Sequence, residues 1–242
     1  MKRSAKQEIE IKLRVADAAG MRRLLRRMGA RAVRRVHELN TLFDTPQGTL
    51  RKQGRLMRLR EETALRGKGS GTGDQGSGKK RGKRGQGKAR VGARYVLTFK
   101  GPVKKNKQQD LTSARPAVRD ARDVSYKRYK VREEAEYIVE NPRAIWAVAG
   151  PAGMRRSFRY EKFRTSYRVP GAGEVHVEFD ETPTGVFLEL EGPRRAIDRM
   201  ARRLGYRPAD YIVRSYAALH FEECRRRGKR AGDMMFKAKK SC

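Results

Sequence analysis

With 242 residues, the chain is long enough to bury a sizeable core, and its 60 Lys and Arg residues against 27 Asp and Glu residues give a formal net charge of +33. This charge favours a polyanionic partner, such as a phosphate compound, a nucleic acid or an anionic surface. Two cysteines are too few for a disulfide framework, and no apolar run is long enough for a signal peptide or a membrane span. We therefore expect a cytoplasmic protein that does not act on membranes.

The first predicted strand covers residues 8–15. Successive side chains on a strand point to opposite faces, so its apolar residues share one face and its charged residues share the other. The charged face consists of Glu8, Glu10, Lys12 and Arg14. A single strand of this kind is explained by an antiparallel sheet with one face in water.

The same alternation recurs along the chain. It predicts seven or eight strands in all, each with an apolar face opposite a face rich in Glu, Lys and Arg. Apolar stripes and capping residues predict helices between the strands and at the end of the folded part. Beyond 8–15, the predicted strands are 37–44, 56–60, 94–100, 129–139, 158–169, 174–180 and 186–191, and the predicted helices are 17–28, 142–148, 193–204 and 210–226.

Two basic segments lack the residues that a core needs. Residues 63–93 consist mainly of Gly, Lys, Arg and Ser, and we interpret them as a disordered insertion in a hairpin loop. Residues 228–242 resemble a loose basic tail. Within the insertion, residues 73–80 nearly match a phosphate-binding loop, but Lys80 replaces the hydroxyl residue that would hold magnesium, so we do not predict a nucleotide site there.

The shared strand pattern predicts an α+β fold built on an eight-stranded antiparallel β-barrel. Helices with apolar stripes would cover the apolar outer face, and the charged faces would then line a polar tunnel. Facing cations about 4 Å apart repel by about 4 kcal/mol at an effective dielectric near 20, so such a tunnel needs a polyanion to fill it. Pairs of Glu at i and i+2 supply oxygen ligands suited to magnesium or manganese, which bind carboxylates together with substrate phosphates.

At this point the residues resemble a known family. Glu8-Ile9-Glu10-Ile11-Lys12 is similar to the E-x-E-x-K motif of the CYTH superfamily, the triphosphate tunnel metalloenzymes. This superfamily includes class IV adenylate cyclases, thiamine triphosphatases and inorganic triphosphatases. The resemblance spans residues 6–222, and its further motifs are Phe43-Asp44-Thr45-Pro46, Leu56 to Arg60, Leu97 to Pro102, Arg132-Glu133-Glu134, Lys162 to Tyr167, Glu178-Phe179-Asp180, Glu189-Leu190-Glu191 and Ser215-Tyr216.

The resemblance implies a role for each matching residue. The metal ligands, for magnesium or manganese, would be Glu8, Glu10, Glu189 and Glu191. The triphosphate would be held by Lys12, Arg58, Arg60, Lys100, Arg132, Lys162 and Arg164, of which Lys12, Lys100 and Lys162 would be catalytic. The insertion and the tail depart from the family pattern.

The sequence leaves the reaction open. A class IV cyclase-like enzyme would convert ATP to cyclic AMP and pyrophosphate, whereas a triphosphatase would hydrolyse tripolyphosphate or thiamine triphosphate with the same residues. A remote alternative is a basic nucleic-acid-binding protein. The insertion and the tail could also bind polyanions without specificity as an accessory property.

Overall fold

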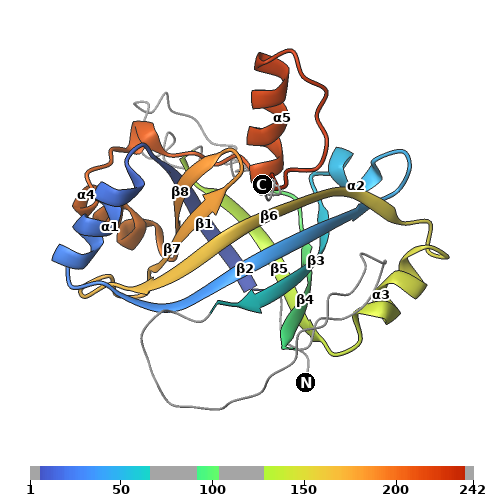
Figure 1. The fold of residues 1–242 in the computed structure, drawn as a ribbon, viewed down its shortest axis with the longest axis horizontal. Coiled ribbons are helices and arrows are strands. Elements are labelled where there is room, and N and C mark those ends of the chain that lie inside the picture. Colours follow the sequence, from blue (N-terminus) through green and yellow to red (C-terminus); the bar gives the residue numbers. More distant parts are fainter. Residues whose placement is uncertain (1–5, 66–91, 104–127, 238–242) are drawn as a thin grey trace, which may run out of the picture.

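The computed structural model describes residues 6–65, 92–103 and 128–237, and its central feature is a closed antiparallel β-barrel (Figure 1). The strand order around the barrel is β1-β5-β4-β3-β2-β6-β7-β8. This confirms the predicted α+β fold with an eight-stranded barrel. The strands are β1 (Lys6–Val15), β2 (Arg31–Asp44), β3 (Leu56–Ala64), β4 (Ala93–Lys100), β5 (Lys130–Val139), β6 (Arg155–Arg168), β7 (His176–Thr182) and β8 (Gly185–Glu191).

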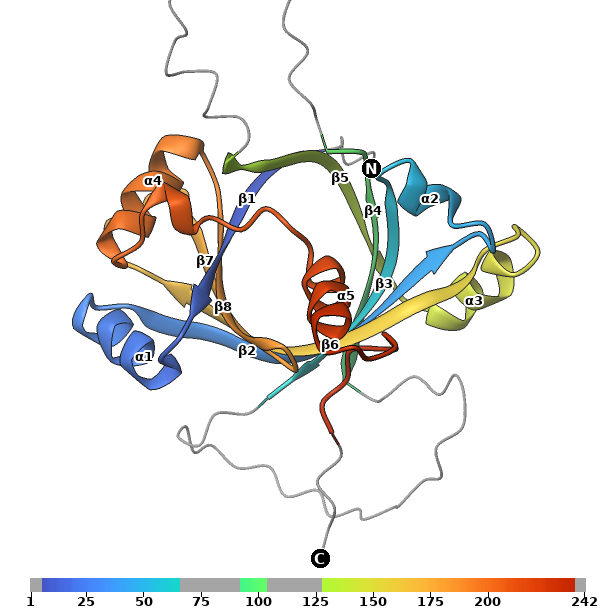
Figure 2. The same cartoon turned by 90° about the horizontal axis from the view of Figure 1, so that it is seen from above.

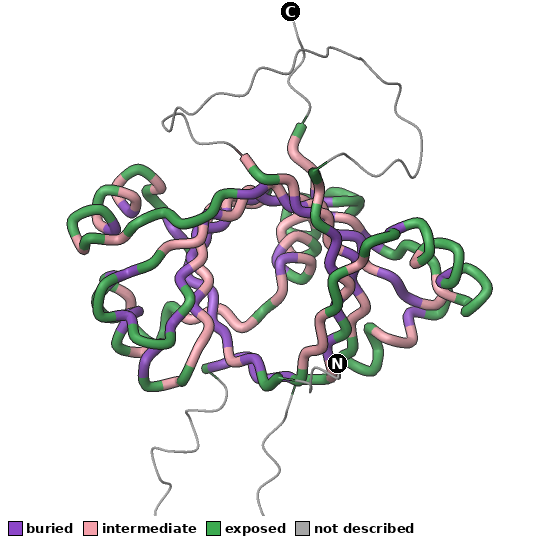
Figure 3. The backbone as a smooth tube through the Cα atoms, turned by 90° about the horizontal axis from the view of Figure 1, so that it is seen from below, coloured by how far each residue is buried: buried purple, intermediate pink, exposed green. Residues whose placement is uncertain are grey.

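The alternation of the sequence decides which side of the barrel each residue occupies. The apolar residues of β1, β7 and β8 face outward, where α1 (Ala18–Arg27) and α4 (Arg194–Arg203) cover them (Figure 2). Ile11 and Leu13 are fully buried in this outer core. In Figure 3, buried segments follow the strands, and exposed backbone follows the outer turns of the helices. Charged residues at alternate positions are consequently left to line the interior.

Local capping explains where two helices begin. The side chain of Asp17 accepts a hydrogen bond from the backbone of Gly20 at 2.9 Å and caps α1. Asp44 accepts from the backbone of Leu50 at 2.8 Å and of Arg51 at 3.1 Å, which fixes the short helix α2 (Thr49–Lys52). The helices predicted from the sequence do not include this one. Asp44 of the Phe43-Asp44-Thr45-Pro46 motif thus has a structural role.

Helices α3 and α5 differ in how closely they follow the prediction. Helix α3 (Pro142–Ala149) lies where it was predicted and packs on the barrel through Trp146 and Phe43, whose ring centroids are 4.9 Å apart. The last helix, α5 (Tyr216–Arg226), begins six residues later than predicted, and only a 3-10 turn (Pro208–Asp210) precedes it. None of the helices in the described part of the chain is both long and apolar enough to cross a membrane.

The late start of α5 has a physical cause. Ile212 exchanges two backbone hydrogen bonds of 2.9 Å with Lys12, so this segment is extended and pairs with β1 instead of coiling. Ser215 then caps the helix by accepting from the backbone of Ala218. As a result, α5 lies across one end of the barrel (Figures 1 and 2).

The structure describes only the ends of the predicted basic insertion but most of the predicted basic tail. Strand β3 extends through Ala64 and β4 begins at Ala93, so the ends of the predicted 63–93 insertion belong to strands. Residues 66–91, including the near match to a phosphate-binding loop at 73–80, lie outside the described residues. In the predicted loose tail, Met234 is buried and pairs with Tyr160 of β6, so this part of the tail packs on the barrel.

Candidate active site

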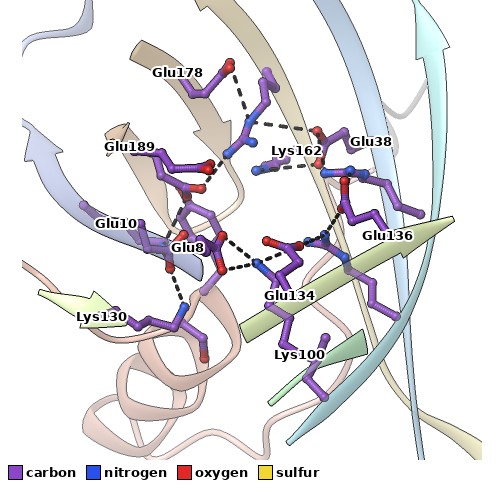
Figure 4. Close-up of a pocket in the computed structure, with 18 of the residues that line it drawn as sticks. Glu8, Glu10, Glu38, Lys100, Lys130, Glu134, Glu136, Lys162, Glu178 and Glu189 are labelled. Atoms are coloured by element: carbon purple, nitrogen blue, oxygen red, sulfur yellow. Dashed lines mark hydrogen bonds and ion pairs between the residues drawn. The ribbon is translucent and has the colours of Figure 1, made fainter. Parts of the chain in front are cut away.

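The barrel encloses a cavity of about 450 Å³ that is lined by side chains from all eight strands (Figure 4). The predicted site residues come from six different strands, and they meet only because the sheet closes with its charged faces inward. All of them line this one cavity: Glu8, Glu10, Lys12, Arg58, Arg60, Lys100, Arg132, Lys162, Arg164, Glu189 and Glu191. Their individual roles remain predictions.

Glu8 lies on the carboxylate-rich side of the cavity, close to a predicted catalytic lysine. Lys100 Nζ donates to both carboxylate oxygens of Glu8 at 2.7 Å and lies 3.1 Å from Glu134 Oε1. The pKa of Glu8 is nevertheless raised to about 7, because burial and the charge of Glu10 outweigh the attraction of Lys100. Glu8 is therefore a carboxylate whose charge Lys100 alone does not balance.

Lys12 lies between two of the other predicted metal ligands. Its Nζ is 3.0 Å from Glu10 Oε1 and 3.3 Å from Glu189 Oε2, and all three side chains are buried or nearly so. Burial alone would lower the pKa of Lys12, but attraction by the two carboxylates raises it above its ordinary value. Burial raises the pKa of Glu10 and nearby lysines lower it, with the lysines prevailing. Lys12 and Glu10 are thus both held in their charged forms.

Strand β8 completes this carboxylate-rich side with Glu191. In the antiparallel register Glu191 faces Glu10, two positions along from the pair that Glu189 forms with Lys12. The pKa of Glu191 is raised by burial, by Glu8 and by Glu189. Repulsion within this group would be relieved by an added cation.

A second group of cations in the cavity is also paired with acids, and its member Arg164 lies 3.1 Å from Glu189 Oε1 as well. Lys162 Nζ lies 2.9 Å from Asp180 Oδ2, and Arg164 Nη2 lies 2.6 Å from the same oxygen. Glu38, only 1% exposed, lies 3.6 Å from Lys162. Burial raises the pKa of Glu38, but Lys162, Arg164 and the arginines of β3 lower it well below its ordinary value. These acids hold the cations in place in the absence of a bound anion.

Two predicted phosphate ligands have unused hydrogen-bond donors. Arg58 Nη2 donates to Thr98 at 3.1 Å, and Arg132 Nη2 donates to the backbone oxygen of Gly54 at 3.0 Å. The Nε–H groups of Arg58 and Arg132 are buried and have no hydrogen-bond partner among the residues that the structure describes. A buried donor without a partner lowers the stability of the protein. An anionic oxygen in the cavity would accept hydrogen bonds from these donors and offset that loss.

The sequence model of the CYTH domain family matches residues 6–216, which is most of the chain. The chain belongs to the CYTH domain family. CYTH proteins are metal-dependent triphosphate tunnel enzymes, so the charged barrel interior is the expected place for both the metal and the substrate. A search of curated protein sequences finds no match.

Solved structures of similar proteins support the same fold. A protein of Pyrococcus horikoshii OT3 called PH1819 has a TM-score of 0.60 at 18% identity over 89% of this chain and 99% of its own. A candidate adenylate cyclase from Vibrio parahaemolyticus has a TM-score of 0.59 at 17% identity over 89% and 98%. A candidate adenylyl cyclase from Hippeastrum, described as having a dominant triphosphatase activity, has a TM-score of 0.51 at 17% identity over 93% and 97%.

Several residues of the CYTH tunnel were not predicted as site residues. Asp180, Glu38 and Lys130 are buried charged groups that contact the predicted residues. Tyr216 of α5 donates a hydrogen bond of 2.6 Å to Asp180 and places its ring 5.2 Å from Lys12. The strand residues share faces with predicted site residues, so the alternation could have identified them. Tyr216 approaches from outside the sheet, which strand alternation does not indicate.

The carboxylates of β1 and β8 fit a divalent metal by their chemistry. Carboxylate oxygens are ligands that magnesium and manganese prefer. Burial, together with repulsion from neighbouring carboxylates, raises the pKa values of Glu8 and Glu191, and a bound cation would offset that repulsion. Among the described residues, however, no three acidic, His or Cys side chains converge closely enough to hold an ion. Glu8 forms an ion pair with Lys100, and Glu10 forms one with Lys12. Metal binding would therefore require these ion pairs to exchange.

Proposed function

We propose that this protein is a magnesium- or manganese-dependent enzyme that cleaves a triphosphate held in its tunnel, with the conversion of ATP to cyclic AMP and pyrophosphate as the first reaction to test. The observation that carries the proposal is the pair of unpartnered, buried Nε–H donors of Arg58 and Arg132 in a cavity rich in cations. Such donors match the oxygens of a phosphate chain in geometry and charge.

Two groups of residues in the cavity would have different roles. Arg58, Arg132 and Lys162 would bind phosphoryl oxygens and neutralise charge that develops on them. Glu8, Glu10, Glu189 and Glu191 would hold the metal. When bound, magnesium or manganese supplies a Lewis acid that orients phosphoryl oxygens for in-line displacement. Lys12 and Lys100 would leave their carboxylate partners and turn to the substrate.

A second cavity gives a specific reason to test ATP. It has a volume of about 640 Å³, which suits a small organic group, and part of its wall is apolar, with Leu42, Val213 and Phe158. It borders the tunnel, because four residues line both cavities, namely Leu56, Lys130, Arg132 and Ser215. A triphosphate in the tunnel could place an organic substituent such as a nucleoside in this space.

Hydrolysis is the second candidate reaction. In the cyclase reaction the ribose 3′-hydroxyl attacks the α-phosphorus and pyrophosphate leaves. In hydrolysis water attacks the terminal phosphorus, which becomes orthophosphate, and the rest of the substrate leaves as a diphosphate. The Hippeastrum structure, which shares this fold, belongs to a protein described as having a dominant triphosphatase activity. Tripolyphosphate and thiamine triphosphate are therefore the substrates to compare with ATP.

One assay tests the proposal and separates the two reactions. Purified full-length protein is incubated with magnesium or manganese and with ATP, tripolyphosphate or thiamine triphosphate, and every product is identified by chromatography. Arg58→Ala and Arg132→Ala should lose most of the turnover, whereas the matched surface variant Arg227→Ala, at the residue directly after α5, should keep it. If no substrate is cleaved with either metal, the proposed function is wrong.

Three expectations from the sequence stay predictions. Polyanion binding through the basic insertion involves residues 66–91, which lie outside the described part of the chain. The cytoplasmic location and nucleic-acid binding as the main function also remain untested. The assay above bears on the latter, because a protein whose only function is nucleic-acid binding would cleave none of the three triphosphates.

A further inference from the structure

The two helices that cover β1, β7 and β8 lie side by side and present arginines to solvent (Figures 1 and 2). Their apolar sides share one core cluster, which fixes the opposite sides outward. We call the exposed set the arginine face. It consists of Arg26 and Arg27 of α1, Arg195, Arg199, Arg202 and Arg203 of α4, and Arg31 and Arg168 at the neighbouring strand ends.

The spacing along α4 shows that these side chains form a stripe. Arg195, Arg199 and Arg202 follow one another at i, i+4 and i+7, which places them on one side of a helix over about 10 Å. The buried residues of α4, including Ile197 and Met200, occupy the other side. The stripe therefore points away from the barrel and away from the tunnel inside it.

The acidic residues of the two helices do not balance this charge. Asp198 of α4 is turned inward and accepts hydrogen bonds from the hydroxyl groups of Tyr129 and Tyr211. Asp17 caps α1 and pairs with Arg23, outside the arginine face. Within the described part of the chain, no ion pair involves a member of the arginine face. The face is thus a set of arginines without fixed counter-charges.

A second, independent observation at the strand ends also indicates that this face lacks counter-charges. Arg31 of β2 lies directly opposite Arg168 of β6 in the antiparallel register, and both are exposed. Like charges directly opposite each other destabilise a sheet. The turn after β6 joins this pair to the helices: a Cβ added at Gly171 would lie 3.2 Å from Arg203 Nη1, and one added at Gly29, after α1, would lie 3.3 Å from Pro170.

Helix electrostatics explain only part of the pattern. Arg26, Arg27, Arg202 and Arg203 lie in the last turns of their helices, where cations interact favourably with the helix dipole. This does not account for Arg195 in the first turn of α4, where a cation is disfavoured, or for the opposed pair at the strand ends. An external polyanion accounts for both.

We propose that the arginine face binds the phosphate backbone of a nucleic-acid duplex without sequence preference. Neither α1 nor α4 contains an aromatic residue on which an unpaired base could stack, so the face suits phosphates and not exposed bases. Arginine is well matched to phosphate oxygens because its donors form a rigid fork. This activity is separate from the tunnel chemistry, since the face lies on the outer side of the barrel wall.

The test compares two triple variants of the full-length protein that lose the same charge. One carries Arg195→Gln, Arg199→Gln and Arg202→Gln. The control carries Arg225→Gln, Lys229→Gln and Arg230→Gln, which are exposed positions at the end of α5 and just after it. Binding to a fluorescent DNA duplex of about 20 base pairs is measured by anisotropy at about 50 to 200 mM salt, a range over which backbone contacts weaken strongly.

The parent protein should bind the duplex with an affinity that falls steeply with salt. Each lost phosphate contact reduces the slope of log K against log salt by about 0.9, so the α4 variant should lose about 2 to 3 units of slope and about tenfold or more in affinity. The control should change by about threefold or less, and both should keep the parent's melting temperature and triphosphate turnover. The proposal is overturned if the parent does not bind or if both variants lose equal affinity.

Discussion

Lys100 on β4 reaches past β5 to hold Glu8 on β1, with its Nζ at 2.7 Å from both carboxylate oxygens. A predicted phosphate ligand and a predicted metal ligand therefore form an ion pair with each other. Breaking a buried ion pair by removing one partner leaves an uncompensated charge. A bound metal would replace Lys100 as the partner of Glu8, and a bound triphosphate would replace Glu8 as the partner of Lys100. We therefore expect the two ligands to bind cooperatively.

The first prediction concerns this pair. Lys100→Met should free Glu8 and thereby tighten the binding of manganese in the absence of triphosphate, because carboxylates without a lysine partner attract a cation more strongly. Turnover of triphosphate should fall by orders of magnitude. Isothermal titration with manganese measures the first effect. Lys229→Met, at an exposed lysine after α5 that does not line the tunnel, is the control and should keep the parent's manganese affinity. Equal manganese affinity in the parent and Lys100→Met would contradict the ion-pair exchange.

The second prediction concerns the phosphate ligands. Tripolyphosphate with metal should raise the melting temperature of the parent protein by mass action. Replacing Arg58, Arg132 or Lys162 by Ala should remove a charge-assisted contact worth about 2 to 5 kcal/mol and reduce this rise strongly. Arg227→Ala should show the parent's full rise, since Arg227 is exposed and lies directly after α5, outside the tunnel. A thermal-shift series in which every variant gains as much as the parent would rule out triphosphate binding in the tunnel.

The sequence predicted the fold well because one physical rule governs most of it. Alternation puts Glu8 and Lys12 on the same side of a strand, and the need to bury Ile11 under helices sends that side inward. What the sequence did not reveal depends on contacts between distant segments. Ile212 pairs with Lys12, so the residues before Tyr216 are extended and α5 starts later than predicted. Helix periodicity in the sequence cannot indicate such a pairing. The ion pairs within the site likewise depend on the closed barrel, because their partners come from different strands.

The third prediction is a pH dependence of stability that arises from Glu8. Its pKa is about 7 in the folded protein and has an ordinary value of 4.5, so between these values the folded state holds a proton that the unfolded state has lost. The contribution of Glu8 to the free energy of unfolding is therefore complete below pH 4.5 and is lost as the pH rises through 7. Glu8→Gln stays neutral and should not show this loss.

Denaturant unfolding in the presence of a chelator measures the effect. Between about pH 5 and 7.5, the parent should lose a few kcal/mol more than Glu8→Gln, since each pKa unit corresponds to about 1.4 kcal/mol. The exposed residue Glu140 provides the control, and Glu140→Gln should follow the parent. If the parent and Glu8→Gln have the same pH dependence, the raised pKa of Glu8 is refuted.

The fourth prediction concerns the C-terminal segment, which the sequence suggested was loose. Met234 is only 1% exposed and packs in a cluster with Tyr160, Phe187 and Tyr216, beneath the helix that closes one end of the tunnel. Its backbone exchanges hydrogen bonds of 2.9 and 3.0 Å with β6. Met234→Ala should therefore lower the free energy of unfolding by about 2 to 5 kcal/mol, the usual cost of truncating a buried large side chain.

The neighbouring methionine makes a matched comparison. Met235 follows Met234 directly and is only partly buried, so Met235→Ala should cost about 1 kcal/mol or less. Because Met234 contacts the cluster that contains Tyr216 and not the phosphate ligands themselves, Met234→Ala should keep triphosphate turnover at temperatures where it is fully folded. Denaturant unfolding of both variants decides the point: equal, small losses would mean that residues 228–237 add nothing to the stability of the barrel.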